Sequence, residues 1–152
     1  MQSTTIAVDT AKLVFEVVVS KSGRVLAYTL LSDLPRVWAG SDYVAEQFIR
    51  DPRLGEWLAA SPLRRRLDGG DLAEQVREAV MACQDEDALK AALRRLRHRH
   101  MVRLIWRDLT GLADYHATVA DLSLLADTLI STALERLYQW ACERGGVPRD
   151  ED

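Results

Sequence analysis

Residues 89–112 read LKAALRRLRHRHMVRLIWRDLTGL, and this stretch decides the fold. Its apolar residues recur at steps of three to five positions, which predicts one face of an amphipathic helix. The members of this face are Leu89, Leu93, Leu96, His100, Leu104, Leu109 and Leu112, with Met101 and Ile105 beside them. We expect the chain after about residue 30 to pack on this face.

The opposite face of the same predicted helix is basic. It carries Arg94, Arg95, Arg97, Arg99, Arg103 and Arg107. Such a row can bind the phosphates of nucleic acid, or it can form salt bridges with acidic helix ends and neighbouring protein surfaces. The second interpretation is favoured, because no aromatic side chains interleave with the arginines and the net charge is -3. The six arginines are the candidate binding face of the chain.

Composition places the chain among ordinary globular proteins. It has 152 residues, 48% hydrophobic and 28% charged, which suits one domain with a modest core. Cys83 and Cys142 lack the paired spacing of zinc sites, so we expect both to be small core residues. No leader-like segment and no membrane-length apolar run is recognised, and the expected location is cytoplasmic, away from membranes.

The first 30 residues differ from the rest because β-branched residues alternate along them. This pattern predicts strands at residues 4–9, 13–20 and 24–30, which form a small antiparallel β-meander. From Leu34 onward the patterns are helical. The predicted fold class is therefore mainly α: a module of five to six helices over residues 31–148 after a β-meander over residues 1–30, with a disordered tail at residues 149–152.

Capping signals divide the helical part. Ser41 is a predicted N-cap, and Asp51 with Pro52 opens a second helix that runs to about Ala60. Asp71 and Glu74 have the spacing of a capping box for a helix that ends near Cys83. The next helix is opened by Asp85, Glu86 and Asp87 and closed by Gly111.

The last helix is predicted from Asp114 to Arg144, with Ser123 as a possible junction. Its expected buried face comprises Leu122, Leu125, Leu129, Ala133, Leu137 and Trp140 or Ala141.

Several residues that could carry chemistry have simpler structural interpretations. Gly69 and Gly70 precede three acids, but these acids open a helix, whereas a nucleotidyltransferase needs its magnesium ligands on a strand. His98 and His100 are two apart on a helix and cannot share a metal, and His116 stands alone. No catalytic, cofactor-binding or metal-binding residue is predicted.

Residues 31–148 resemble the N-terminal helical region of the bifunctional glutamine synthetase adenylyltransferase/adenylyl-removing enzymes. The resemblance is carried by LPRVW at residues 34–38, SDYVAE at residues 41–46, and RHRHMVRLIWRDL at residues 97–109. The last segment is similar to the family pattern RxRxMxRIAWRDL, with Ile105 where alanine is usual. Further matches are GLAD at residues 111–114, Leu122 with Ser123, LAD at residues 125–127, and Leu137 with Tyr138.

The resemblance implies a role in the regulation of nitrogen metabolism. In the family a nucleotidyltransferase domain that uses ATP and magnesium follows the helical segment, and no residue here matches its catalytic positions. We therefore expect a truncated fragment without activity of its own. The implied partners are glutamine synthetase, the PII signalling protein or a separate catalytic domain, and self-association is an alternative because the apolar faces lack a partner.

Residues about 2–25 are similar to the start of insertion-sequence transposases with an RNase H-like DEDD domain. The resemblance matches Asp9 to the first metal-binding acid of that family, without counterparts for the other acids. A gene fusion between a mobile-element fragment and an adenylyltransferase fragment would explain both resemblances. Two alternatives stay open: a transposase-derived or nucleic-acid-binding protein that uses the arginine face, and a structural remnant without selected function.

Overall fold

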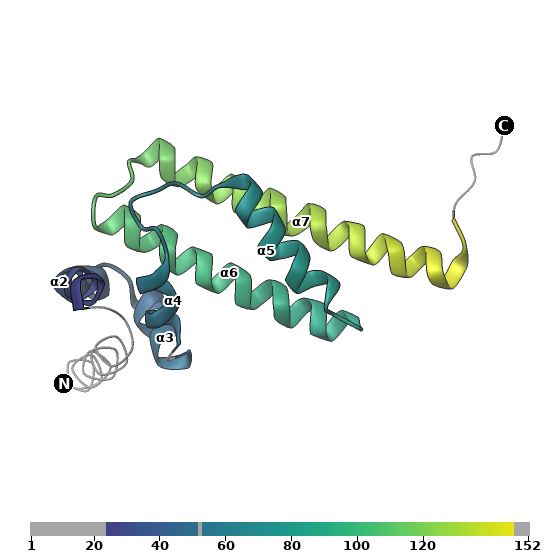
Figure 1. The fold of residues 1–152 in the computed structure, drawn as a ribbon, viewed down its shortest axis with the longest axis horizontal. Coiled ribbons are helices and arrows are strands. Elements are labelled where there is room, and N and C mark those ends of the chain that lie inside the picture. Colours follow the sequence, from purple (N-terminus) through teal and green to yellow (C-terminus); the bar gives the residue numbers. More distant parts are fainter. Residues whose placement is uncertain (1–23, 52, 148–152) are drawn as a thin grey trace. The chain divides into compact units, whose positions relative to one another are not determined.

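A computed structural model describes residues 24–51 and 53–147, and it contains six helices and no strand within those ranges (Figure 1). The helices are α2 (Arg24–Gly40), α3 (Asp42–Arg50), α4 (Leu54–Ala60), α5 (Gly69–Met81), α6 (Glu86–Leu109) and α7 (Tyr115–Gly145). The mainly helical class is confirmed for the described residues. The first two predicted strands and Asp9 lie outside them.

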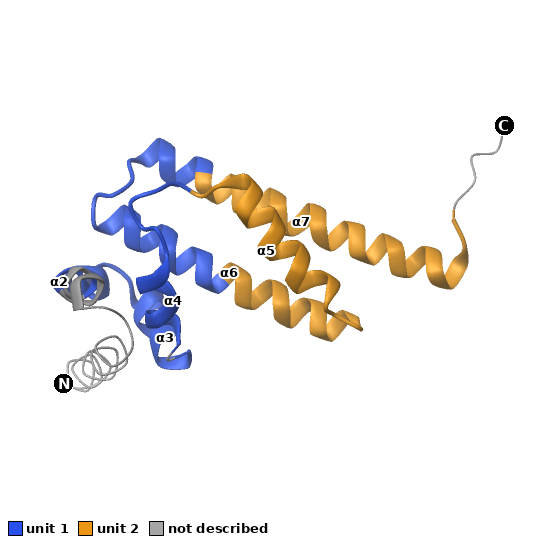
Figure 2. Ribbon diagram, in the orientation of Figure 1, with its two compact units in different colours: residues 1–66, 98–120 blue, residues 67–97, 121–152 orange. Residues whose placement is uncertain are grey.

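The chain forms two compact units (Figure 2). Unit 1 comprises residues 1–66 and 98–120, and unit 2 comprises residues 67–97 and 121–152. Both α6 and α7 contribute residues to each unit. The sequence-based boundary after residue 30 falls inside α2, so that division of the chain stays a prediction.

The core of unit 1 lies where α2, α3 and α4 pack on one another and on α6. Phe48 of α3 lies against Trp106 of α6, with ring centroids 6.1 Å apart. Gly40 ends α2 beside Leu109, and a Cβ at this position would lie 3.0 Å from the leucine side chain. The buried members of this core are Leu30, Leu34, Val37, Val44, Phe48, Leu54, Leu58, Ala59, Val102 and Trp106.

Unit 2 has its own buried residues. Leu72, Val76 and Val80 recur every four positions along α5 and are all buried, as one face of an amphipathic helix requires. Leu89 and Ala92 of α6 and Leu125 of α7 are also buried. Two hydrogen bonds connect α7 to chain segments on either side of α5. The Leu67 N–H donates to Asp121 Oδ2 at 3.3 Å, and Arg136 Nη2 donates to the Cys83 carbonyl oxygen at 3.0 Å.

The predicted strand at residues 24–30 is wrong, because α2 begins at Arg24. The β-branched residues favoured a strand, but Leu30, Leu34 and Val37 follow the helical steps of four and three, and all three are buried. Burial of that face outweighs a β propensity that spans only about 1 kcal/mol. The helix continues through Pro35.

Most helix ends agree with the predicted signals, and two do not. Ser41 caps α3 by accepting from the Val44 N–H, and Asp85 accepts from the Ala88 N–H at the start of α6. The α5 cap is Asp68 instead of Asp71, because the Asp68 side chain accepts from two N–H groups of the first turn. Helix α4 begins at Leu54, later than Asp51 and Pro52 suggested.

Glycine ends both long helices in the left-handed conformation. Gly111 has φ 73° and Gly146 has φ 81°. After α6, Leu112 N–H donates to the Arg107 carbonyl and Gly111 N–H to the Asp108 carbonyl, which is the hydrogen-bond pattern of a Schellman motif. The predicted closure by Gly111 is confirmed.

Helix α7 is continuous through Ser123, so the predicted junction there is wrong. The predicted buried face is only partly correct. Leu125 is buried, whereas Leu122 and Leu137 are exposed. Cys83 is buried and Cys142 is half-buried, and both are free thiols.

Candidate functional site

Two buried arginines of α6 hold the loop that follows α4 in unit 1. Arg103 and Arg107 are 3% and 2% exposed. Arg103 Nη2 donates to the carbonyl oxygens of Pro62 and Arg65, at 3.1 and 2.6 Å. Arg107 Nε donates to the Leu63 carbonyl oxygen at 2.9 Å. Burying a cation is unfavourable unless it is hydrogen-bonded. These three bonds, which we call the arginine clasp, therefore fix the backbone of residues 62–65.

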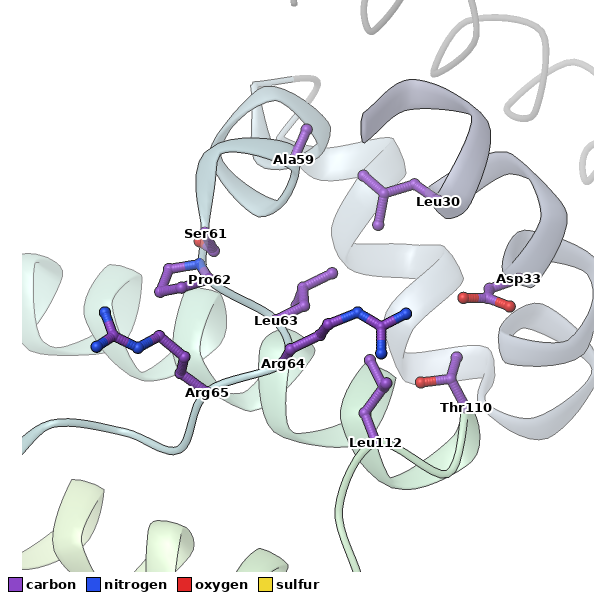
Figure 3. A pocket seen from close by; sticks show the side chains of 10 residues that line it. All are labelled: Leu30, Asp33, Ala59, Ser61, Pro62, Leu63, Arg64, Arg65, Thr110 and Leu112. Atoms are coloured by element: carbon purple, nitrogen blue, oxygen red, sulfur yellow. The ribbon is translucent and has the colours of Figure 1, made fainter. Parts of the chain in front are cut away.

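The clasped loop forms one wall of a pocket in unit 1 of about 560 Å³ (Figure 3). The other walls come from α2, the end of α4 and the segment that ends α6. Its lining residues are Leu30, Asp33, Ala59, Ser61, Pro62, Leu63, Arg64, Arg65, Thr110 and Leu112. Half of these side chains are apolar and half are polar or charged, and the volume lies in the range of small-molecule pockets.

Polar groups of the pocket come from three different segments. Figure 3 shows Arg64 extending towards Asp33 and Thr110, whereas Arg65 extends the opposite way. Arg64 and Arg65 are exposed. The hydroxyls of Ser61 and Thr110 donate to carbonyl oxygens of the helices that precede them, α4 and α6, at 2.8 and 2.7 Å. The pocket thus combines an apolar wall with one carboxylate and one guanidinium.

The histidines of α6 point to different neighbours, as their spacing predicted. His98 Nδ1 lies 2.8 Å from the Tyr43 hydroxyl in a hydrogen bond. His100 is buried and packs edge-on against Trp57, with ring centroids 5.5 Å apart. Burial, then the charges of Arg103 and Arg99, lower the pKa of His100 to about 4. His100 is therefore neutral at pH 7 and serves as a core residue.

The structure divides the six arginines that formed the candidate binding face. Arg103 and Arg107 face the clasped loop and are buried, so they are not available to a partner. Arg99 Nη2 lies 3.8 Å from the Asp51 carboxylate. Arg94, Arg95 and Arg97 are exposed. The basic face is thus shorter than the sequence suggested, and a binding role for its exposed part stays a prediction.

Acidic residues do not gather into a metal site in the part of the chain that the structure describes. No three His, Cys, Asp or Glu side chains there are placed to hold a metal ion. His116 stacks edge-on with Tyr115 and joins no cluster of this kind.

Unit 2 presents an exposed apolar stripe on α7. Its members, which we call the α7 stripe, are Leu122, Ala126, Ile130, Leu134, Leu137 and Ala141. They follow one another at steps of three and four, so they share one helical face. Ile130 and Leu134 are each 65% exposed. Large apolar side chains so exposed in a row are typical of an interaction surface.

By length and composition alone, α7 is the one described helix that could cross a membrane. Only 17% of its most apolar window is buried. This finding differs from the expectation that no such segment exists. A single helix of this kind is weak evidence, because core helices of soluble proteins pass the same test.

The amino-acid sequence matches the profile of a protein family over most of its length. The profile of the family "Glutamate-ammonia ligase adenylyltransferase" matches residues 31–152. The chain belongs to this family. The adenylyltransferase resemblance of residues 31–148 is therefore confirmed, whereas the transposase resemblance of residues about 2–25 finds no support.

Several relatives carry the name bifunctional glutamine synthetase adenylyltransferase/adenylyl-removing enzyme. The Pseudomonas syringae pv. tomato adenylyltransferase is 45% identical over 114 residues, which cover 74% of this chain and 12% of the relative. The Pseudomonas aeruginosa enzyme is 44% identical over 119 residues, and the Thioalkalivibrio sulfidiphilus enzyme 42% over 120 residues. Each of these two alignments covers 78% of this chain and 12% of the relative. No solved structure matches the chain.

Sequence reasoning missed the arginine clasp and the pocket. The clasp joins residues 38 to 44 positions apart, and no local spacing encodes such a contact. The pocket combines three separate stretches of the chain. One signal was present: Arg103 and Arg107 are one helical turn apart and next to apolar positions, so a partly buried pair was a reasonable alternative to a solvated face.

Proposed function

We propose that residues 31–147 form a helical scaffold segment of an enzyme that adenylylates glutamine synthetase and removes the adenylyl group. The observation that carries this proposal is the family match over residues 31–152. The relatives are named for both activities, and the matched segment is 12% of their length. A segment of this size supplies one part of the enzyme.

The geometry of unit 1 supports a scaffold role. Its two most deeply buried cations, Arg103 and Arg107, hold a loop of the same unit. His100 is neutral and packed against Trp57. Buried polar groups that hold a loop and pack against neighbouring side chains specify the shape of unit 1. The pocket, with Arg64 among its lining residues, results from that shape.

The cofactors, the substrate and a further partner of the enzyme are also part of the proposal. We propose that ATP and magnesium bind to another part of the enzyme, which acts in the cytoplasm. Glutamine synthetase is the proposed substrate, because the relatives are named for it. An interaction with the PII protein stays a prediction from the family resemblance alone.

A hybrid enzyme tests the proposal. Residues 31–152 replace the matched segment of the Pseudomonas aeruginosa enzyme, which is 44% identical. We expect the hybrid to transfer radiolabelled adenylyl groups from ATP to glutamine synthetase. The 152-residue chain alone should transfer none, and the Pseudomonas enzyme without its matched segment should have lost most of its activity.

Two controls make the result decisive. A hybrid with Val44→Asp, which places a charge in the core of unit 1, should lose the activity that the first hybrid retains. Circular dichroism and size-exclusion chromatography establish that the first hybrid is folded. A folded hybrid without adenylyl transfer would contradict the scaffold role.

A further inference from the structure

The C-terminal part of α7 has little packing within unit 2. Helix α7 is 31 residues long, and its last buried residue is Thr132. Figure 2 shows α7 continuing past the end of α5 within unit 2. Most helical stability comes from tertiary packing of an apolar face, and an isolated stretch of three turns is marginal in water. The last turns of α7 therefore need a partner.

The α7 stripe supplies the surface for this partner. At 1.5 Å per residue, the distance from Leu122 to Ala141 along the helix is about 29 Å. Every member of the stripe is apolar and uncharged, and Tyr138, which is 55% exposed, lies beside it. The charged residues Asp127, Glu135 and Arg136 occupy other positions around the helix. A long uncharged stripe beside charged positions is the pattern of a helix that docks against protein.

We propose that the α7 stripe docks against the part of the same adenylyltransferase polypeptide that lies outside the matched segment. This inference rests on the proposed function. The stripe lies within the residues that match the family, and the matched segment is 12% of each relative. In each relative, the matched segment is thus covalently linked to a polypeptide several times its own length. A linked partner has a high effective concentration, which favours it over a second copy of the chain.

The charges of α7 favour a protein partner over a lipid one. Arg136 donates to the Cys83 carbonyl and stacks over Trp140, with Cζ 4.8 Å from the ring centroid. Asp121 is buried and accepts from the Leu67 N–H. A span of about 20 residues that includes Asp121 would have to move this carboxylate into hydrocarbon and give up its contact, which is costly.

A charged pair on the stripe tests the inference. Ile130→Glu with Leu134→Glu is introduced into the hybrid enzyme and, separately, into the 152-residue chain. The matched control is Ser131→Glu with Gln139→Glu, which adds the same charge to exposed positions on the other side of α7. The readout is the rate at which a limiting protease cleaves α7, followed by mass spectrometry.

The inference predicts a difference between the two proteins. In the hybrid the stripe pair should accelerate cleavage of α7 several-fold relative to the control pair, because a docked helix is protected and an undocked one is not. In the 152-residue chain the two pairs should give the same rate. Equal rates in the hybrid, or acceleration by the stripe pair in both proteins, would overturn the inference.

Two further measurements test whether the α7 stripe binds a second copy of the chain or a membrane instead. If the 152-residue chain sediments as a discrete dimer at pH 7.5, away from its isoelectric point, and the stripe pair makes it a monomer, the occupant is a second copy. If the chain floats with phosphatidylethanolamine–phosphatidylglycerol vesicles and the stripe pair abolishes flotation, the occupant is a membrane. Either result overturns the inference, and a monomer that does not float supports it. Adenylyl transfer by the unmodified hybrid reports separately on the proposed function, so the two can fail independently.

Discussion

At the scale of the residue, unit 1 depends on polar groups that are buried beside apolar ones. Arg103, Arg107 and His100 lie on the same helix within seven positions, and all three are at most 5% exposed. Each arginine donates to carbonyl oxygens of the loop, whereas the histidine is buried in its neutral form. Each of these arrangements has a measurable effect on stability.

Loss of one clasp arginine should destabilise the protein strongly. Arg107→Met keeps most of the side-chain length but leaves the Leu63 carbonyl without its charged donor. A buried hydrogen bond to a charged group is worth about 1.5–3 kcal/mol. We expect a loss of this size in the free energy of unfolding, measured by urea denaturation. Arg95→Met, at an exposed position of α6, should change it by less than about 0.5 kcal/mol, and equal effects would contradict the clasp.

The neutral state of His100 should make stability depend on pH. Its pKa is lowered to about 4 in the folded protein, against 6.5 for the ordinary side chain. Between these values the unfolded chain binds the proton more readily, so stability should fall as pH decreases from 6.5 to 4 and level off below. The difference in pKa corresponds to a loss of about 3 kcal/mol.

His100→Gln provides the comparison for this prediction. Urea unfolding of the variant should lack the part of the pH dependence that belongs to the histidine, while carboxylates affect both proteins alike. Parallel profiles for the two proteins between pH 6.5 and 4 would show that His100 is not responsible.

At the scale of the element, the sequence correctly predicted those helix ends that depend on residues close together in the chain. The caps Ser41 and Asp85 and the closing Gly111 act within four residues, and the structure confirms each of them. The start of α2 was not predicted. Residues 24–30 have a local β propensity, but they belong to a helix whose apolar face is buried in the core. The predicted cap of α5 was wrong because two acids, Asp68 and Asp71, lie near the start of the helix and either could act as its N-cap.

The cap of α5 can be tested directly. Asp68→Ala removes the acceptor of the Gly70 and Asp71 N–H groups, whose nitrogens lie 2.9 and 3.0 Å from Asp68 Oδ1. We expect it to lower the free energy of unfolding by about 1 kcal/mol. Asp71→Ala should lose only the helix-dipole effect of a few tenths of a kcal/mol. A larger loss of stability for Asp71→Ala than for Asp68→Ala would instead support Asp71 as the cap, as the sequence suggested.

At the scale of the whole molecule, the sequence predicted the class and the family but not the surfaces. Helical periodicity marks a face as apolar without indicating whether that face is covered. Leu122 and Leu137 were therefore expected in the core and are exposed. The pocket was unpredictable for a related reason, since its residues come from three separate stretches that only the folded unit 1 brings together.

Exposure of the α7 stripe should limit the solubility of the 152-residue chain. The isoelectric point is about 5.6, and loss of net charge removes the repulsion that opposes association through apolar surface. We expect static light scattering, at equal concentration and ionic strength, to be higher at pH 5.6 than at pH 7.5. Ile130→Ser with Leu134→Ser, which keeps the charge, should reduce scattering at pH 5.6. Equal scattering by the variant and the original chain would exclude the stripe as the cause.

The arginine clasp also has a consequence for how this protein can change. Arg103 and Arg107 bind main-chain oxygens, which every amino acid supplies, so the path of residues 62–65 is set without reference to the side chains of the loop. Outward residues such as Arg64 and Arg65 can accordingly be exchanged, in evolution or by grafting of foreign sequences, while the loop keeps its shape. The clasp makes this loop a site where new specificity can arise without a new fold.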